Sequence, residues 1–133
     1  MNELTTEART ENLEILMNFV DTGLEKADCS VKMRTQISIA VEEIFVNIAN
    51  YAYSPEIGSV TIRLTAGDEI IISFEDNGKP YNPFEGTGPD ITTDVQEREV
   101  GGLGIFMVRS IMDSVEYRRV GDKNVFVMKK RLV

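Results

Sequence analysis

The sequence predicts an α+β fold, a two-layer sandwich in which about three helices cover one face of a largely antiparallel β-sheet. Two observations predict it: apolar residues recur at helical spacing through most of the first 51 residues, and two pairs of alternating segments with short turns follow. Helices followed by hairpins are typical of α+β proteins. A length of 133 residues suffices for a buried core, so we expect a single domain over residues 1–133.

A short strand at residues 2–8 and a helix over residues 11–26 are expected to open the fold. The helix is predicted by apolar residues three or four positions apart, which are Leu13, Leu16, Met17, Val20 and Leu24. Thr10 precedes this pattern and is a candidate N-cap.

The second predicted helix begins near Ser30 and continues to about Tyr51, before the turn-forming "SPEIG". It is apolar around most of its circumference, yet Glu43, Asn47 and Asn50 form a polar stripe at positions i, i+4 and i+7. Burying a carboxylate without a partner is costly. The stripe therefore indicates either a ligand site or a hydrogen-bonded polar network in the core or at an interface, which is common in proteins.

Two hairpins and a third helix complete the predicted elements. "SVTIRL" and "EIIISFE" alternate apolar and polar residues on either side of "TAGD", and "VEYRRV" and "VFVMKKRL" flank "GDKN". Between the hairpins, "IFMVRSIM" predicts a helix over about residues 104–113. Residues 77–101 are rich in glycine and proline, and loops longer than about 12–15 residues in a compact domain are usually lids, binding loops or disorder. We expect a lid.

The composition excludes several kinds of function. The chain has no histidine, which removes Ser-His-Asp and Cys-His nucleophile systems, HExxH zinc chemistry and an internal phosphohistidine. Its single cysteine allows no internal disulfide, and its net charge of −8 argues against nucleic-acid binding. There is neither a membrane-length apolar run nor a signal-peptide pattern, so we expect a cytoplasmic protein without membrane or direct nucleic-acid partners.

Three short motifs have side chains suited to chemistry. In "EEIFVN", Glu43 and Asn47 share one helix face, so that a proton acceptor and an amide ligand for Mg²⁺ can converge. In "EDNG", Asp76 follows a strand and can accept a hydrogen bond from an exocyclic amine, while Gly78 lets the backbone approach a ring. In "GGLG", glycines open a helix whose amides can face phosphate. Each motif alone is also explained by ordinary structure: a polar network, a turn and a helix start.

Taken together and in this order, the motifs resemble those of the GHKL ATPase superfamily. The stretches "AVEEIFVNIANYAY", "FEDNGKPYNPF" and "GGLGIFMVRSIMDSVEY" are similar to its N, G1 and G2 boxes. Within the superfamily, the sequence most resembles the small anti-sigma-factor serine/threonine kinases of bacteria. The resemblance, from about residue 10 to the end, implies the Bergerat-type ATP-binding fold with a mixed, largely antiparallel sheet and an ATP lid at about residues 79–100.

The resemblance also implies roles for individual residues. Asn47 would coordinate Mg²⁺, Glu43 would be the general base, and Asp76 would bind the adenine amino group with Gly78 behind the base. The polar stripe, including Asn50, would face Mg-ATP. Glu42, rotated 100° from Glu43, would be a supporting or solvent residue. The amides of the lid-hinge segment would meet the phosphates, and that segment consists of Gly102, Leu103 and Gly104.

Two positions depart from the family pattern. Relatives often place a threonine on a late strand near the adenine, and "KNVFVMKK" contains none. Some relatives carry an arginine just before the G2 glycines, where this chain has Val100, with Arg98 nearby but out of register.

The function implied is phosphorylation of a STAS-type anti-sigma-factor antagonist, which would release or capture a sigma factor and so regulate transcription; a homodimer is possible. Two alternatives remain open from the sequence. In the first the chain would be a nucleotide-gated protein-binding module that transfers no phosphate, and in the second it would be a catalytic domain of the histidine-kinase type.

Overall fold

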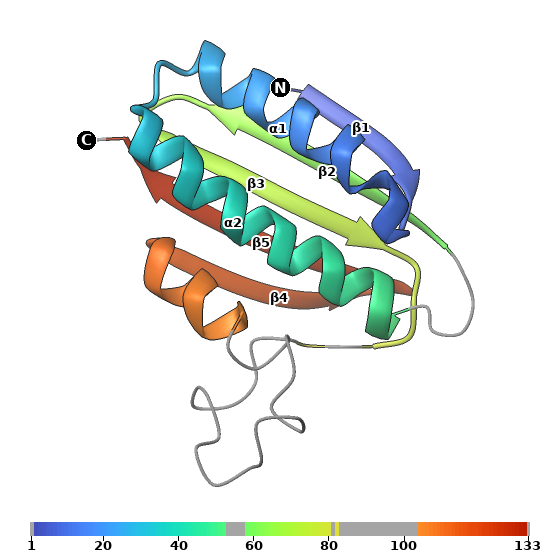
Figure 1. Ribbon diagram of the computed structural model, residues 1–133. Helices are drawn as coiled ribbons and strands as arrows, with labels where there is room; N and C mark the ends of the chain where they lie inside the picture. Colours follow the sequence, from blue (N-terminus) through green and yellow to red (C-terminus); the bar gives the residue numbers. More distant parts are fainter. Residues whose placement is uncertain (1, 53–57, 81, 83–103, 133) are drawn as a thin grey trace, which may run out of the picture.

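The computed structural model describes residues 2–52, 58–80, 82 and 104–132, and side chains within this set except those of residues 51 and 52 (Figure 1). Five strands form one sheet in the order β1-β2-β3-β5-β4, and each of the four pairings is antiparallel. The strands are β1 (Asn2–Glu7), β2 (Ser59–Ala66), β3 (Glu69–Asp76), β4 (Ser114–Val120) and β5 (Lys123–Arg131). Both predicted hairpins are confirmed.

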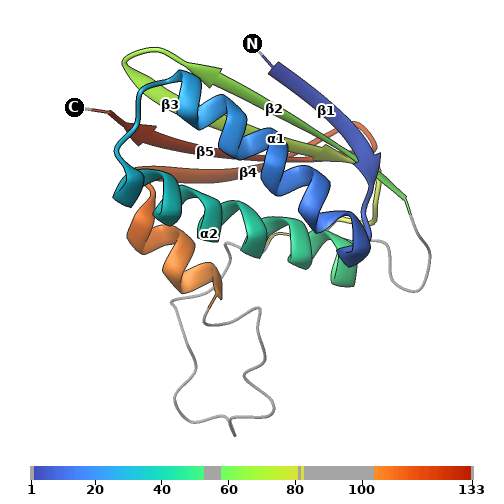
Figure 2. The ribbon, with the colours of Figure 1, turned by 45° about the horizontal axis from the view of Figure 1, so that its top comes forward.

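Helices cover one face of this sheet. They are α1 (Leu13–Lys26), α2 (Val31–Asn47) and a helix over residues 104–111. Figure 1 shows them over the sheet, and in the turned view of Figure 2 they remain on the same side. The α+β class and the two-layer arrangement are therefore confirmed.

The core lies between the two layers, where the alternation along β2 and β3 predicts it. Ile62, Leu64, Ile72 and Phe74 are almost completely buried, while the residues between them are partly exposed on the opposite face. The helices contribute Leu16, Val20, Leu24, Val41, Ile44 and Phe45. Fully burying one such side chain contributes about 1.5–3 kcal/mol, so this contact surface is the main source of stability.

The prediction of Thr10 as an N-cap is wrong. Residues Thr10–Asn12 form a short 3₁₀ helix (η1), and the Thr10 hydroxyl donates to Glu11 Oε1 at 3.1 Å. Helix α1 then begins at Leu13 without a side-chain cap. The predicted start of α2 is confirmed, because the Ser30 hydroxyl accepts a hydrogen bond from the Met33 amide at 3.1 Å.

The second helix is regular only as far as Asn47. Residues Ile48–Ala52 form a π-helical turn (η2), which the sequence does not predict. A π-turn is wound with i→i+5 hydrogen bonds, so side chains within it are spaced around the axis differently from those of an α-helix. Asn50 is accordingly exposed, while Asn47 is buried, so the polar stripe does not continue along one buried face.

The predicted lid lies mostly outside the described residues, which include only 79, 80 and 82 of it. Gly102 and Leu103 lie outside them as well. Within the described ranges, no helix combines the length and the apolar character needed to cross a membrane.

Candidate functional site

The first group of predicted site residues lies in the C-terminal half of α2. Glu43 and Asn47 are one turn apart, and the Asn47 amide donates from Nδ2 to the Glu43 carbonyl at 2.7 Å. This bond assigns the nitrogen end of the buried side chain to the helix backbone. The oxygen, Oδ1, is thus the Asn47 atom suited to bind a metal.

The Glu43 carboxylate faces the start of the helix over residues 104–111. A β-carbon built on Gly104 would overlap the Glu43 carboxyl group, so a side chain at this position is incompatible with the observed arrangement. The structure therefore brings Gly104 to Glu43 and Asn47, which lie far from it in the chain. A side chain at position 104 would therefore displace the Glu43 carboxyl group or the helix start.

The Glu43 carboxyl group is poorly solvated. Its Oε2 atom is buried and has no hydrogen-bond partner among the described residues. This burial, with a smaller contribution from the Glu42 charge, raises the pKa of Glu43 above its ordinary value. A carboxylate in this state has an unused acceptor atom and an increased affinity for a proton, which are the properties of a general base.

The second group of site residues surrounds Asp76 at the end of β3. Asp76 is 2% exposed, and its Oδ1 atom accepts from the Gly78 amide at 2.8 Å and from the Asn124 side chain at 2.9 Å. Its Oδ2 atom is buried without a hydrogen-bond partner in the described part of the chain. Burial raises the pKa of Asp76, while hydrogen bonds from Asn124 and Gly78 and the Arg119 charge oppose the rise.

The sequence does not single out Asn124, although it is completely buried beside Asp76. It lies in β5 directly opposite Asp76, within the late-strand stretch "KNVFVMKK" noted for its lack of threonine. Asn124 also donates to the Lys79 carbonyl at 2.9 Å and accepts from Tyr117 and Arg119. Only the register of β3 against β5 could have indicated this residue, because an isolated asparagine in a strand forms no motif.

The two groups lie at the same end of the molecule. In Figures 1 and 2 the C-terminal end of α2 and the end of β3 point to the same side of the fold. Asn50, in the π-turn beyond Asn47, has an exposed side chain. The remaining predicted phosphate contacts, Gly102 and Leu103, belong to the segment that the structure does not describe.

The ligand atoms available at this site suit a metal ion that is also bound by the phosphates of a nucleotide. In the described ranges no group of three or more His, Cys, Asp or Glu residues could hold a metal ion. Mg²⁺ commonly uses one or two protein oxygens and completes its shell with water and substrate phosphates. Asn47 Oδ1 suits that arrangement and would not form a separate protein-only site.

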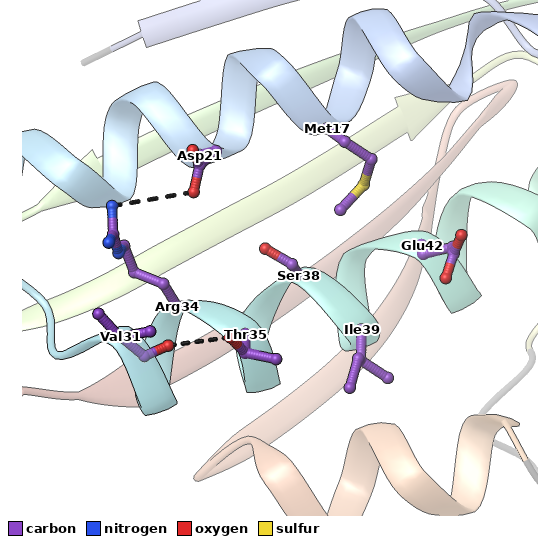
Figure 3. Close-up of a pocket in the computed structure, with 8 residues that line it drawn as sticks. All are labelled: Met17, Asp21, Val31, Arg34, Thr35, Ser38, Ile39 and Glu42. Carbon is purple, nitrogen blue, oxygen red and sulfur yellow. Dashed lines mark hydrogen bonds and ion pairs between the residues drawn. The ribbon is translucent and has the colours of Figure 1, made fainter.

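A separate cleft of about 400 Å³ lies between α1 and α2 (Figure 3). Glu42 lines it together with Met17 and Arg34, and the Arg34 guanidinium is 4.0 Å from Asp21. Glu42 and Glu43 are adjacent in the chain, yet Glu42 belongs to this cleft and Glu43 faces Gly104. The expectation that Glu42 is a supporting or solvent residue of the site stays a prediction.

Comparison with known proteins places most of the chain in one protein family. Residues 6–130 match the family described as histidine kinase-like ATPase domain. The chain belongs to this family. The ATPase domain is thus a member of the GHKL superfamily, as the resemblance implies, and membership implies that it binds ATP.

The relatives of this ATPase domain include regulators of sigma factors. It is 29% identical over 128 residues to an anti-sigma F factor of Clostridium perfringens, covering 94% of this chain and 91% of that protein. It is 29% identical over 97 residues to the serine-protein kinase RsbW of Listeria monocytogenes, covering 68% of this chain and 62% of the kinase. The serine/threonine-protein kinase BtrW of Bordetella bronchiseptica is 26% identical over 93 residues, with 68% and 65% covered.

Solved structures agree with the fold. The RsbU and RsbW domains of Rv1364c from Mycobacterium tuberculosis match with a TM-score of 0.65 and 12% identity, over 99% of this chain and 33% of that one. The histidine kinase domain from the Erythrobacter litoralis EL346 blue-light activated histidine kinase matches with a TM-score of 0.52 and 17% identity, over 90% and 61%. At these identities the likeness shows the fold alone.

Proposed function

We propose that this protein is a Mg-ATP-dependent serine/threonine kinase that phosphorylates a STAS-type anti-sigma-factor antagonist and so regulates a sigma factor by partner switching. The observation that supports kinase activity most directly is the Glu43 carboxylate, which is half-buried and has an unused oxygen one helical turn from Asn47. The proposed class of substrate rests on the relatives, which include an anti-sigma F factor and the kinase RsbW.

Each residue has a defined part in the proposed reaction. Asp76 holds the adenine amino group, and Gly78 allows the backbone to pass close to the base. Bound Mg²⁺ would neutralise phosphate charge, with Asn47 Oδ1 as its protein ligand. Glu43 accepts the proton of the attacking serine or threonine hydroxyl, whose oxygen forms a bond to the γ-phosphorus as the bond to the ADP oxygen breaks. Amides near Gly104, at a helix start, suit the phosphate charge.

The decisive test is phosphate transfer from [γ-³²P]ATP to the antagonist encoded nearest to this gene. Glu43→Gln keeps the size and hydrogen bonding of the side chain and removes the proton acceptor. Since general-base assistance is worth about 10²–10⁴ in rate, transfer should fall by that factor with little change in ATP affinity. Glu42→Gln is the matched control, because Glu42 lines the α1–α2 cleft, and it should transfer phosphate at close to the wild-type rate.

Two results would contradict the proposal. Full transfer by Glu43→Gln would show that another group accepts the proton. A wild-type protein that binds ATP and its partner tightly, yet transfers no phosphate to it, would instead be a nucleotide-gated binding module.

A further inference from the structure

Asn124 is held in one orientation by its neighbours. Its Nδ2 atom donates to Asp76 Oδ1 and to the Lys79 carbonyl, each at 2.9 Å. Its Oδ1 atom accepts from Arg119 at 3.1 Å. A backbone carbonyl can only accept and a guanidinium can only donate, so these two partners fix which end of the amide is nitrogen.

With Asn124 in this orientation, Oδ2 is the Asp76 oxygen that is left to accept a hydrogen bond from a ligand. Oδ1 already receives hydrogen bonds from Gly78 and Asn124, whereas Oδ2 is buried and without a partner in the described ranges. A buried acceptor in this condition costs free energy unless a ligand donor reaches it. The ligand group that best fits Oδ2 is therefore a hydrogen-bond donor such as an amine.

We propose that Asn124 is a positioning residue that aims Asp76 Oδ2 at the 6-amino group of a purine and thereby sets the preference for adenine over 6-oxo purine nucleotides. The inference rests on the proposed nucleotide site and extends it to base selection. A 6-oxo group is an acceptor, so opposite Oδ2 it would leave two acceptors facing each other without a proton between them.

Side chains of β4 hold Asn124 in turn. The Tyr117 hydroxyl donates to Asn124 Oδ1 at 2.5 Å, and its ring packs against Phe126 with 5.3 Å between centroids. Arg119 contacts both Asn124 and the Gly78 carbonyl, the latter at 2.8 Å. The β4–β5 hairpin thus holds the segment after β3 through hydrogen bonds to the Gly78 and Lys79 carbonyls.

These contacts also affect the ionisation of the Asp76 carboxylate. The hydrogen bond from Asn124 lowers the pKa of Asp76 against the effect of burial, as do the Gly78 amide and the Arg119 charge. Asn124 therefore supports both the direction and the ionised state of the carboxylate that reads the base.

The test compares the affinities of ATP and inosine triphosphate, measured by calorimetry in Mg²⁺. Inosine triphosphate carries a 6-oxo group in place of the 6-amino group and a proton on N1, and its sugar and triphosphate are those of ATP. Hydrogen bonds to charged groups are strong enough that wild-type protein should prefer ATP by at least about 10-fold. Asn124→Leu should bring this ratio close to one, while Asn18→Ala, on the exposed side of α1, should leave it unchanged.

Tyr117→Phe provides a milder variant in case loss of the buried Asn124 amide prevents folding. It keeps the ring against Phe126 and removes only the donor to Asn124. The ATP preference should fall by about 2-fold or more, as expected for one neutral hydrogen bond. Circular dichroism and thermal melts would confirm that each variant is folded.

The possible outcomes separate this inference from the kinase proposal. If folded Asn124→Leu and Tyr117→Phe bind both nucleotides more weakly but keep the wild-type ratio, Asn124 is only structural and the inference is wrong. Equal wild-type affinity for the two nucleotides would also overturn it. Strong ATP preference without phosphate transfer would support base selection and reject kinase activity. Wild-type protein that binds neither nucleotide would overturn both.

Discussion

Glu43 and Glu75 illustrate how neighbouring groups set the behaviour of a carboxylate. Glu75 lies between two cations, with Arg63 at 2.8 Å and Lys123 at 3.2 Å, and its pKa is lowered mainly by the hydrogen bond from Arg63. Within the described part of the chain, Glu43 forms no ion pair with a cation and has a buried oxygen without a hydrogen bond, and burial raises its pKa. The Glu75 carboxylate therefore stabilises the fold at neutral pH, whereas the charged Glu43 carboxylate lowers the free energy of unfolding.

Because the buried charge of Glu43 lowers stability, we expect Glu43→Gln to be more heat-stable than wild type at pH 7. Because the pKa is raised in the folded state, that state binds more protons than the unfolded chain, and stability falls as pH rises from about 4.5 through the raised value. The neutral glutamine avoids this loss. The gain should disappear below the unfolded pKa, where glutamate is neutral in both states.

Thermal melts between pH 4 and pH 8 would check this prediction. Glu14→Gln, an exposed carboxylate on α1, should change the melting temperature little across that range. A lower melting temperature for Glu43→Gln at pH 7 would mean that the charged form of Glu43 makes a stabilising contact.

Asn47 predicts the metal dependence of nucleotide binding. Wild-type protein should bind ATP measurably with Mg²⁺ and much more weakly with EDTA, because the net charge of −8 offers little other compensation for phosphate. Asn47→Ala removes the proposed ligand oxygen and should bind ATP with similar affinity in both conditions. Calorimetry with Asn18→Ala as control would measure this, and unchanged metal dependence in Asn47→Ala would exclude Asn47 as the ligand.

At the scale of elements, periodicity identified the helices and hairpins because burial on one face repeats over many residues. The alternation through Ile62, Leu64, Ile72 and Phe74 is of this kind. Local irregularities and isolated polar contacts were missed. The 3₁₀ turn that displaces the Thr10 cap, the π-turn after Asn47 and the burial of Asn124 against Asp76 leave no periodic pattern in the sequence.

The contact between α2 and the helix over residues 104–111 predicts a strong effect of Gly104→Ala. The added methyl group would overlap the Glu43 carboxylate, so that Glu43 or the helix start must move. Phosphate transfer should fall by at least about 10-fold, since a small displacement of Glu43, the proposed general base, would slow the reaction strongly. Gly67→Ala is the control, because a β-carbon there meets nothing within 4 Å.

A double-mutant cycle makes this prediction specific to the Gly104–Glu43 contact. Once Glu43→Gln has removed the proposed base, Gly104→Ala should cause little further loss in transfer rate. Independent, multiplying effects would show that Gly104 acts through a different group.

At the scale of the whole molecule, alternating charges connect four strands on the face of the sheet away from the helices. Glu3 in β1 pairs with Arg63 in β2 at 2.7 Å, and Arg63 and Lys123 both pair with Glu75 in β3. Most of these groups are partly exposed, and exposed ion pairs are weak individually. Together, however, these ion pairs favour one register of the neighbouring strands β1, β2, β3 and β5.

Arg63→Ala should therefore lower the free energy of unfolding by about 0.5–1 kcal/mol in low salt and by less in 1 M NaCl. The difference should also vanish in acid, because a lowered pKa contributes stability that is lost as pH falls through the folded-state value of Glu75. Urea denaturation would measure both effects. Arg118→Ala, whose pair with Glu116 is exposed and 3.9 Å long, should show neither.

The position of β5 has a consequence for how the protein matures on the ribosome. Although β5 follows every other strand in the chain, it lies inside the sheet between β3 and β4. Until it has emerged and paired, β3 keeps an open edge, and Asp76 lacks Asn124, which is 48 residues further along the chain. Such long-range pairing is slow compared with local helix formation. Under the proposed role of Asn124, a nascent chain would gain its selection of adenine through Asp76 only after its sheet is closed.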